Sequence, residues 1–368
     1  MLDWKSRIAL AALGLGLVAQ AQAADFSVPI SVVGLSEAGA TVADGGPVSS
    51  FGDNPADMVF FPGTRMGLDI IASKPSYTFN GAGGASASPS SKLNILPNLF
   101  VTHRFDSLPL AVGLGITEPY RINTTWPTGS FPGTANAPVN APVKTDLQLI
   151  DVNPGVAYLL LPDLSIGVGV DYYQSISATF DSTLSPASGT GGGVGGNIGL
   201  FYTTETWNAG LSYRSQANIS AAGGTITLPG RAQAGVRYRF TPALATELDV
   251  DWTDWSSAKL PNTPSLGWKS ALAYRLGLSY HLNQDLELRG GLAHESNPAT
   301  SSSYEASVPA AASNLLALGA GVQLGDWHWD LGASYALSGS TTVNNGNGFD
   351  GTYKASAFSF GAALSRHF

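Results

Sequence analysis

Four arginines in the second half of the chain are candidates for binding an anionic group: Arg237, Arg239, Arg275 and Arg289. Each lies on the polar side of a segment in which polar and apolar residues alternate. A guanidinium can bind a carboxylate in bidentate geometry, so such a cation suits a ligand that carries a carboxylate. Three acids occupy the polar side of a following segment: Glu247, Asp249 and Asp251. Two interpretations stay open, ligand contact and a cross-strand ladder of opposite charges.

Other patterns that could support catalysis lack the context that catalysis requires. GGGVGG at residues 191–196 contains a GxGxxG match, but no helical pattern follows it, so dinucleotide binding is not indicated. The histidines lack the spacing of metal ligands. No GxSxG occurs, and a lipase would need a nucleophile, a base and an orienting residue from separate segments. We predict no enzyme activity, no cofactor and no metal site.

The segments that carry the arginines read as β-strands. In residues 271–282, Leu and Tyr alternate with small or polar residues over the whole length. A soluble sandwich would bury the apolar face, whereas a membrane barrel would turn it to lipid. Three features favour the barrel. Tyr and Trp lie near strand ends, the polar face is rich in Gly, Ala and Ser, and a final alternating strand ends in Phe368.

The alternation predicts an all-β fold, a 14-stranded antiparallel transmembrane β-barrel with the even strand number of bacterial barrels. Short turns such as 161–163, 241–242 and 283–285 alternate with long loops rich in Gly, Pro, Ser and Thr. The expected strands are 66–79, 93–105, 108–120, 144–161, 164–181, 192–203, 205–217, 231–240, 243–255, 268–282, 285–294, 313–324, 327–338 and 355–368.

The N-terminus predicts export. Lys5 and Arg7 precede the apolar run 8–19, and Ala21-Gln22-Ala23 fits a cleavage site, so residues 1–23 are predicted to be a signal peptide; a membrane anchor is the alternative. Loss of Asp3, Lys5 and Arg7 takes the net charge from −8 to −9, which argues against nucleic acid as a partner. Cysteine is absent. We predict a protein of the Gram-negative outer membrane.

Residues 24–64 precede the first strand without sustained alternation. They end in FGDNPADMVFFPG (51–63), where an apolar run is bounded by Pro55 and Pro62. A barrel of fourteen strands is too wide for wall side chains alone to fill. The segment carries more apolar residues than a solvated tail should. We therefore predict a hatch, or plug, inside the lumen at 24–64 and a barrel at 65–368; a disordered tail is the alternative.

Several motifs resemble the long-chain fatty acid transporter family of outer-membrane proteins, the FadL/TodX group. They are the hatch motif Asn54-Pro55-Ala56, GLGITEPY at 113–120, the stretch 211–260 with its WTDWS end, the stretch 267–298, and the final strand. The resemblance covers nearly all of the chain after residue 23. It implies that a hydrophobic molecule enters an apolar pocket, that the hatch rearranges, and that the molecule leaves sideways through the barrel wall.

The resemblance also assigns roles to residues. The hatch or gating residues are Asn54, Pro55, Ala56, Phe60 and Phe61. The lateral opening at the third strand involves Gly113, Gly115, Pro119 and Tyr120. Glycine weakens a strand and proline cannot donate to its ladder, which could produce a kink; alternatively, Pro119 simply ends the strand.

The expected function is passive uptake of long-chain fatty acids or similar hydrophobic molecules. Uptake of aromatic or alkane hydrocarbons, a general diffusion porin and a purely structural barrel are the alternatives. Hydrocarbons have no carboxylate, so their pocket would lack an unpaired cation. Expected partners are the hydrophobic ligand, outer-membrane lipid and lipopolysaccharide, and the barrel assembly machinery, with the protein a monomer.

Overall fold

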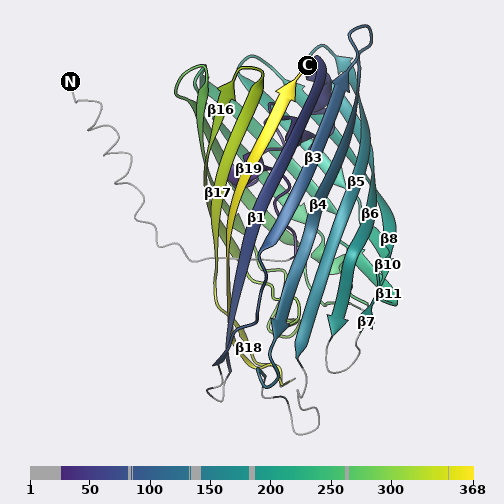
Figure 1. Cartoon of the computed structure of the whole chain (residues 1–368), viewed down its shortest axis with the longest axis vertical. Helices are drawn as coiled ribbons and strands as arrows, with labels where there is room; N and C mark the ends of the chain where they lie inside the picture. The colour runs from purple at the N-terminus through teal and green to yellow at the C-terminus, as the bar shows by residue number, and fades with distance from the viewer. Residues whose placement is uncertain are drawn as a thin grey trace, which may run out of the picture.

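The structure is a computed structural model that describes residues 26–81, 84, 86–131, 133, 142–181, 187–261, 265–346 and 348–368. In Figure 1 it is a tall barrel of tilted strands, with the C-terminus at the upper end. The predicted signal peptide, residues 1–23, lies outside the described residues. Among the described residues, no helix is long and apolar enough to cross a membrane.

In the described part of the chain, fourteen antiparallel strands form the wall, as the alternation predicted. The sheet closes because β1 pairs with both β19 and β3, so that Ile70 lies opposite Ala362 on one side and Pro97 on the other. The wall strands are β1 (Gly63–Gly81), β3 (Asn94–Arg104), β4 (Leu110–Trp126), β5 (Val143–Leu161), β6 (Leu164–Asp181), β8 (Gly192–Thr203), β9 (Trp207–Arg214), β12 (Arg231–Thr241), β13 (Leu244–Thr253), β14 (Ala271–His281), β15 (Leu286–Glu295), β16 (Ser313–Leu324), β17 (Trp327–Ser338) and β19 (Gly351–His367).

Five small strands lie at the end of the barrel where the long loops lie. The short strands β2 (Ser86–Ala87), β7 (Ala187–Ser188) and β18 (Thr341–Val343) pair with neighbouring wall strands. A separate hairpin, β10 (Ala217–Ala221) with β11 (Gly224–Leu228), lies between β9 and β12 in sequence and was not predicted. We call this the long-loop end and the opposite one the short-turn end; Figure 1 shows the C-terminus at the short-turn end.

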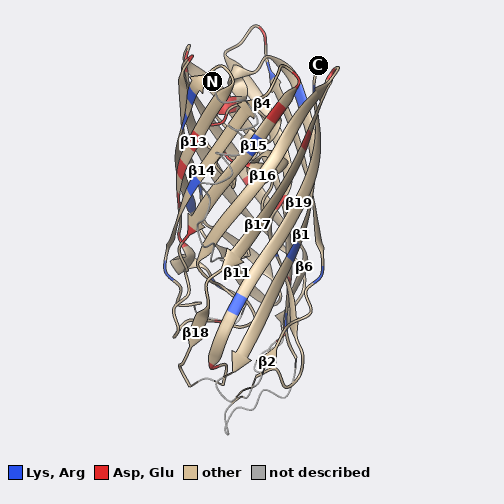
Figure 2. Ribbon diagram, turned by 90° about the vertical axis from the view of Figure 1, so that its left-hand side faces the viewer, with Lys and Arg blue, Asp and Glu red and all other residues tan. Residues whose placement is uncertain are grey.

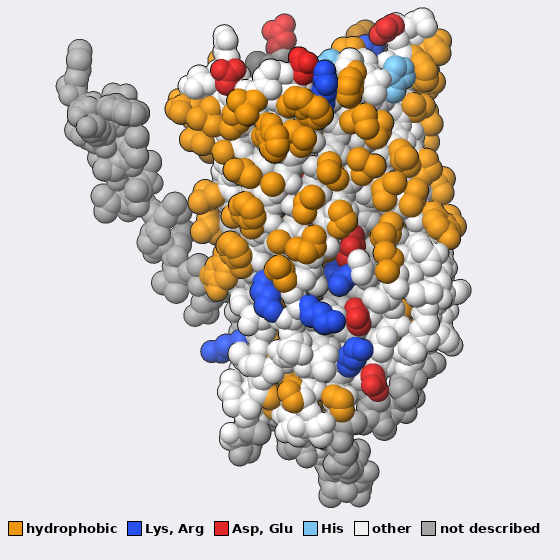
Figure 3. All heavy atoms as spheres, in the orientation of Figure 1, with side chains coloured by type: hydrophobic (Ala, Val, Ile, Leu, Met, Phe, Trp, Pro, Cys, Tyr) orange, Lys and Arg blue, Asp and Glu red, His pale blue; other side chains and the backbone are white. Residues whose placement is uncertain are grey.

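The apolar face of the strands points outward. On β14, Leu272, Tyr274 and Leu276 are exposed while Ala271 and Ala273 are buried. The same period of two continues around the barrel, and Figure 3 shows the resulting apolar band in orange over the upper part of the wall. Figure 2 shows few charged residues along the strands. This is the arrangement of a membrane barrel, and it excludes the soluble sandwich.

The third wall strand departs from the prediction. β4 does not end at Pro119 but continues to Trp126, so the interpretation of Pro119 as a strand end is wrong. The β4–β5 register shifts by one residue between Thr117 and Tyr120. This β-bulge inserts an extra residue around Pro119, where proline cannot donate to the ladder. The chain then pairs with β5 again for seven more residue pairs.

Residues 26–62, the N-terminal segment, contain three short helical turns: α2 (Val32–Ser36), η1 (Val48–Gly52) and η2 (Asp57–Phe60). Ser31 starts α2, and its hydroxyl accepts a hydrogen bond from Gly34 N at 2.9 Å. The segment packs against inward-facing residues of the wall, where a Cβ on Gly210 would lie 1.9 Å from Val42 O. Wall glycines therefore make room for its backbone inside the lumen.

Candidate functional site

Buried carboxylates of the wall hold the backbone of the N-terminal segment. Asp69 on β1 accepts from Val32 N at 2.6 Å. Asp249 on β13 accepts from Thr41 N at 3.0 Å, and from the next amide at 3.2 Å. Hydrogen bonds to charged groups contribute about 1.5–3 kcal/mol each, and these amides have few alternative partners inside the barrel. The acids of β13 thus bind this segment as well as neighbouring arginines.

Glu37 joins α2 to two wall strands through arginines. Its carboxylate accepts from Arg237 Nη1 at 2.8 Å, and Arg289 Nε lies 3.8 Å from it. Arg237 also pairs with Glu247 at 3.0 Å and with Asp44 at 3.2 Å. Desolvation raises the pKa of Glu37, against the lowering effect of Arg237. Arg237 thus pairs with three acids, of which Glu37 and Asp44 belong to the N-terminal segment and Glu247 to the wall.

The other three predicted ligand arginines are also occupied. Arg275 pairs with Asp251 at 2.7 Å and donates to Ala38 O at 3.1 Å. Arg289 pairs with Glu287 and Asp330. Arg239 donates to Asn208 Oδ1 at 3.1 Å and to a backbone oxygen.

The predicted cross-strand pairing of Arg237 and Arg239 with the acids of β13 is therefore seen for one arginine, Arg237, which pairs with Glu247. Arg239 contacts a neutral amide in place of an acid.

Asn54-Pro55-Ala56 touches β6 and β8. Asn54 Nδ2 donates to Val42 O and to Leu200 O, both at 3.1 Å, and its Oδ1 accepts from Ala56 N at 3.1 Å. Ser165 donates to Ala56 O at 2.6 Å. One amide side chain thus connects two parts of the segment to the wall.

The backbone at Pro55 and Ala56 lies against Gly167, where a Cβ would stand 2.5 Å from Pro55 C. Only glycine leaves that space.

Phe51 fills a socket made by glycines of β4 and β5. A Cβ on Gly113 or Gly155 would lie 2.8 or 2.9 Å from Phe51 Cε2, and one on Gly115 would lie 3.3 Å from its Cε1. The ring is 1% exposed and packs in a cluster with Phe100. Gly113 and Gly115 were predicted to weaken the strand. In the structure they lie in its regularly paired part and accommodate this ring.

Phe60 and Phe61 contact the wall. The Phe60 ring lies 5.6 Å from that of Phe201 on β8, and Arg65 lies 4.5 Å from the centroid of the Phe61 ring. Neither phenylalanine lines the cavity described below. Asp57, beside them on η2, accepts from Ser50, and desolvation raises its pKa to about 7.

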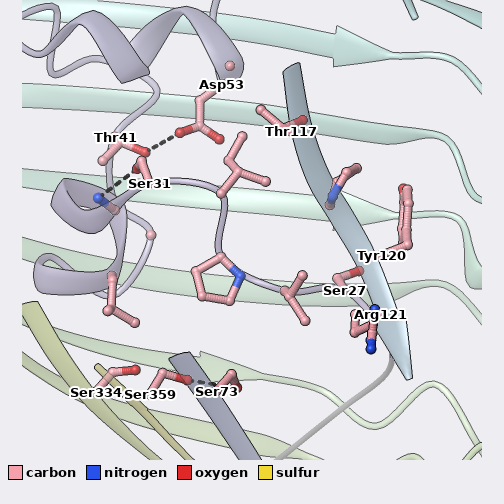
Figure 4. A pocket seen from close by; sticks show the side chains of 18 of the residues that line it. Ser27, Ser31, Thr41, Asp53, Ser73, Thr117, Tyr120, Arg121, Ser334 and Ser359 are labelled. Carbon is pink, nitrogen blue, oxygen red and sulfur yellow. Dashed lines mark hydrogen bonds between the residues drawn. The ribbon is translucent and has the colours of Figure 1, made fainter. Parts of the chain in front are cut away.

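A cavity of about 280 Å³ lies between the N-terminal segment and the wall. Figure 4 shows it bounded by Ser31, Thr41 and Asp53 of the segment and by Ser73 and other residues of the wall. Its apolar lining comes from both sides: Val28, Ile30, Leu35, Phe51, Tyr77, Tyr120, Ile122 and Leu315. The size is near the lower end of small-molecule pockets.

Each arginine that lines this cavity has a carboxylate partner. Arg121 pairs with Glu118 at 3.2 Å. Arg214 pairs with Asp151 at 2.8 Å and with Asp171. Arg231 and Arg275 share Asp251, each at 2.7 Å. Of the four predicted ligand arginines only Arg275 lines this cavity; the others border a second cavity with residues of the short-turn end.

The cavity reaches a split between β3 and β4. Within the described residues, the β3–β4 ladder runs from the pair Arg104–Ala111 to the pair Leu99–Ile116. Residues 94–98 of β3 therefore pair with β1 alone. Asn98 Oδ1 accepts from Glu118 N at 2.8 Å where the strands part. Pro119 and Tyr120 line the cavity at this point, and Figure 4 shows Tyr120 and Arg121 on β4.

The start of the N-terminal segment takes the place of β3 beside the split. Val28 N donates to Pro119 O at 3.0 Å, and Arg121 N donates to Phe26 O at 2.8 Å. Ser27 lies opposite Tyr120 in an antiparallel bridge. At the split, Pro119 O and Arg121 N of β4 are thus satisfied by the segment in place of β3. Sequence analysis missed Phe26, Val28 and Asn98, because these contacts depend on where β3 leaves the ladder.

A model of the family described as outer membrane protein transport protein (OMPP1/FadL/TodX) matches residues 15–225 and 220–368. The chain belongs to this family. A long-chain fatty acid transport protein of Escherichia coli O6:H1 is 25% identical over 88% of this chain and 86% of its own length.

The solved FadL/TodX structures agree in fold. A FadL homologue from Pseudomonas aeruginosa has a TM-score of 0.75 at 16% identity and covers 94% of this chain and 100% of its own. The toluene transporter TodX from Pseudomonas putida has a TM-score of 0.71 at 16% identity, with the same coverage.

As a FadL/TodX barrel, the protein is an outer-membrane protein of a Gram-negative cell. The family is one of transport proteins and not of enzymes. No group of three or more His, Cys, Asp or Glu that could hold a metal was found in the described residues. A lumen occupied by the N-terminal segment also differs from the open channel of a general porin.

Proposed function

We propose that the protein takes up hydrophobic small molecules passively, with long-chain fatty acids as the leading substrate class. The ligand enters from the long-loop end, which faces the cell exterior, and occupies the cavity beside the N-terminal segment. It leaves through the split between β3 and β4 once residues 26–28 move away. The observation that carries this proposal is the cavity's continuity with a split at which Pro119 O and Arg121 N pair with residues 26–28.

Displacing residues 26–28 breaks two backbone hydrogen bonds and withdraws the buried Phe26 ring from Tyr120 and Trp255. The backbone contacts to β4 are two hydrogen bonds, each contributing about 1 kcal/mol net. Residues 24–64 act as the hatch in this scheme, and Asn54-Pro55-Ala56 holds the remainder of the hatch against β6 and β8 while the first residues move. Gating by the hatch thus needs only a local rearrangement. The monomer is sufficient for this route.

Aromatic or alkane hydrocarbons are the second candidate. Each arginine that lines the cavity already has a carboxylate partner, which favours an uncharged ligand. Toluene transporters also occur among the proteins of similar fold. A fatty acid carboxylate would need one of these arginines to exchange its partner.

Uptake of radiolabelled oleate and of toluene by a deletion strain, with and without the gene, separates the two classes. We expect the gene to restore uptake of at least one of them. Uptake of neither would refute the transport proposal. Ion conductance of porin size in planar bilayers would favour an open channel instead.

A reversible disulfide between residues 27 and 120 tests the exit route. Ser27 and Tyr120 are bridge partners, so Cα separations there suit a disulfide, and the chain has no other cysteine. The double variant Ser27→Cys/Tyr120→Cys should block uptake when oxidised and regain it on reduction, whereas each single variant should respond to neither treatment. Uptake at the wild-type rate through the oxidised barrel would exclude this exit.

A further inference from the structure

Lysine and arginine occupy different parts of the barrel. Arg237, Arg275 and Arg289 point into the lumen. The lysines of the described residues instead lie in the half of the barrel with the long loops: Lys74, Lys92, Lys144, Lys259, Lys269 and Lys354. Arginine suits buried pairs with acids, whereas the ammonium group is a compact, strongly hydrated charge. The lysines are thus placed for contact with something outside the lumen.

Three of these residues form a patch on one side of the wall, the lysine patch: Lys74, Lys92 and Lys354. Lys74 follows the exposed Met66, Leu68 and Ile70 on the outward face of β1. On β19, Lys354 shares the outward face with Phe358. Figure 3 shows basic side chains just below the apolar band on the face formed by β19, β1 and β3–β5, with acidic side chains beside those on the right of the view.

A strand register relates Lys74 to Lys354, and a hydrogen bond brings the neighbour of Lys92 to Lys74. β1 and β19 are neighbours, with Lys74 opposite Phe358 and Lys354 opposite Thr78. The two lysines are therefore offset by four residues, about 13 Å along the strands. Lys74 Nζ donates to Ser91 O, which brings the residue before Lys92 against the same strand.

In the described part of the chain, none of the three ammonium groups is in an ion pair, although the arginines of the lumen are. Their opposite residues in the register, Phe358 and Thr78, are uncharged. Lys144 differs, since it lies opposite Asp181 on β6. Three unpaired cations at the edge of an apolar band are therefore available to an external anion.

We propose that the lysine patch binds the phosphate groups of lipid A, the phosphorylated glycolipid of the outer leaflet. The apolar band contacts the acyl chains, so residues just beyond it lie at the depth of the headgroups. A chain of net charge −8 would otherwise be repelled by an anionic leaflet. Basic residues near a membrane surface strengthen binding of anionic headgroups by about fivefold each. The offset of Lys74 and Lys354 lets two phosphates of one headgroup be bound together.

Binding of lipid A to the purified full-length barrel in detergent tests the proposal. Lys74→Gln/Lys92→Gln/Lys354→Gln should bind diphosphorylated lipid A about a hundredfold more weakly than the wild type. Lys259→Gln/Lys269→Gln removes lysines elsewhere at the same end and should stay within about twofold. A triple Lys→Arg variant should retain binding, which separates charge from folding.

Three results would overturn the proposal. The first is wild-type affinity in the triple Gln variant. The second is equal binding of dephosphorylated lipid A, which would show that the acyl chains alone are recognised. The third is full displacement by millimolar inorganic phosphate, which would mark a site for a soluble anion. Heat-modifiable migration on a gel checks that each variant is a folded barrel. None of these outcomes depends on what the channel transports.

Discussion

Replacing Phe51 with alanine should release the N-terminal segment from the wall. The ring is 1% exposed, and burial of a phenylalanine in a packed site contributes about 3–5 kcal/mol. The socket is formed by strand glycines, Gly113 and Gly155, whose backbone is fixed by the barrel, so the site cannot collapse around alanine. The loss should lie toward the upper end of that range because the cavity stays open.

A single introduced thiol can measure the release, since the chain has no cysteine. Ser49 is 4% exposed and lies in η1 beside Phe51, and Ser49→Cys changes its shape very little. When opening is fast relative to labelling, the labelling rate follows the undocked population. A loss of about 4 kcal/mol then predicts labelling about a thousandfold faster in the Phe51→Ala background, up to the rate of a fully exposed thiol.

Phe61→Ala provides the matched control. Its ring is half-buried, and its stacking with Arg65 contributes about 0.5–1 kcal/mol, so labelling should rise less than about tenfold. Both variants should keep the heat-modifiable migration of a folded barrel. Wild-type labelling in the Phe51→Ala background would refute the assignment of Phe51 as the main anchor of η1.

Three further predictions concern the same segment. Replacing residues 54–56 with Gly-Ser-Gly should leave barrel assembly intact but reduce uptake, and normal uptake would deny this motif a gating role. Gly113→Val should displace the Phe51 ring, since even a Cβ would lie 2.8 Å from it, and Phe51→Ala should reverse part of that effect in the labelling assay. The pKa of Asp57 rises to about 7 on docking, so docking is strongest below its unfolded value near 4 and weakens as pH rises to 7. Labelling of a thiol at position 49, normalised to a free thiol, should therefore increase about tenfold or more from pH 5 to 8, and Asp57→Asn should remove most of that increase.

The wall was predictable because a strand in a membrane barrel repeats its environment every two residues. The sequence of residues 271–282 alone shows this alternation, and the structure confirms the strand. The end of β4 was not predictable, because a proline can end a strand or occupy a bulge within one. Only the register with β5, which resumes at Tyr120, decides between the two.

The site was predictable in part. Asn54 and its neighbours were found by their motif, and the structure places them against the wall. The role of Phe51 could not be inferred, since its partners Gly113 and Gly155 are far away in sequence. The acids of β13 were expected to pair with arginines. That Asp249 instead accepts from backbone amides of the N-terminal segment depends on a packing that alternation does not encode.

The separation of lysine from arginine gives the barrel a chemical polarity. Amine-reactive reagents would modify the described lysines at the long-loop end alone and leave the guanidinium network of the lumen unmodified. Coupling through these lysines would thus hold the protein on a support by its long-loop end, with its short-turn end directed into solution. The same reagents, applied to intact cells, would report which end of the barrel faces the medium.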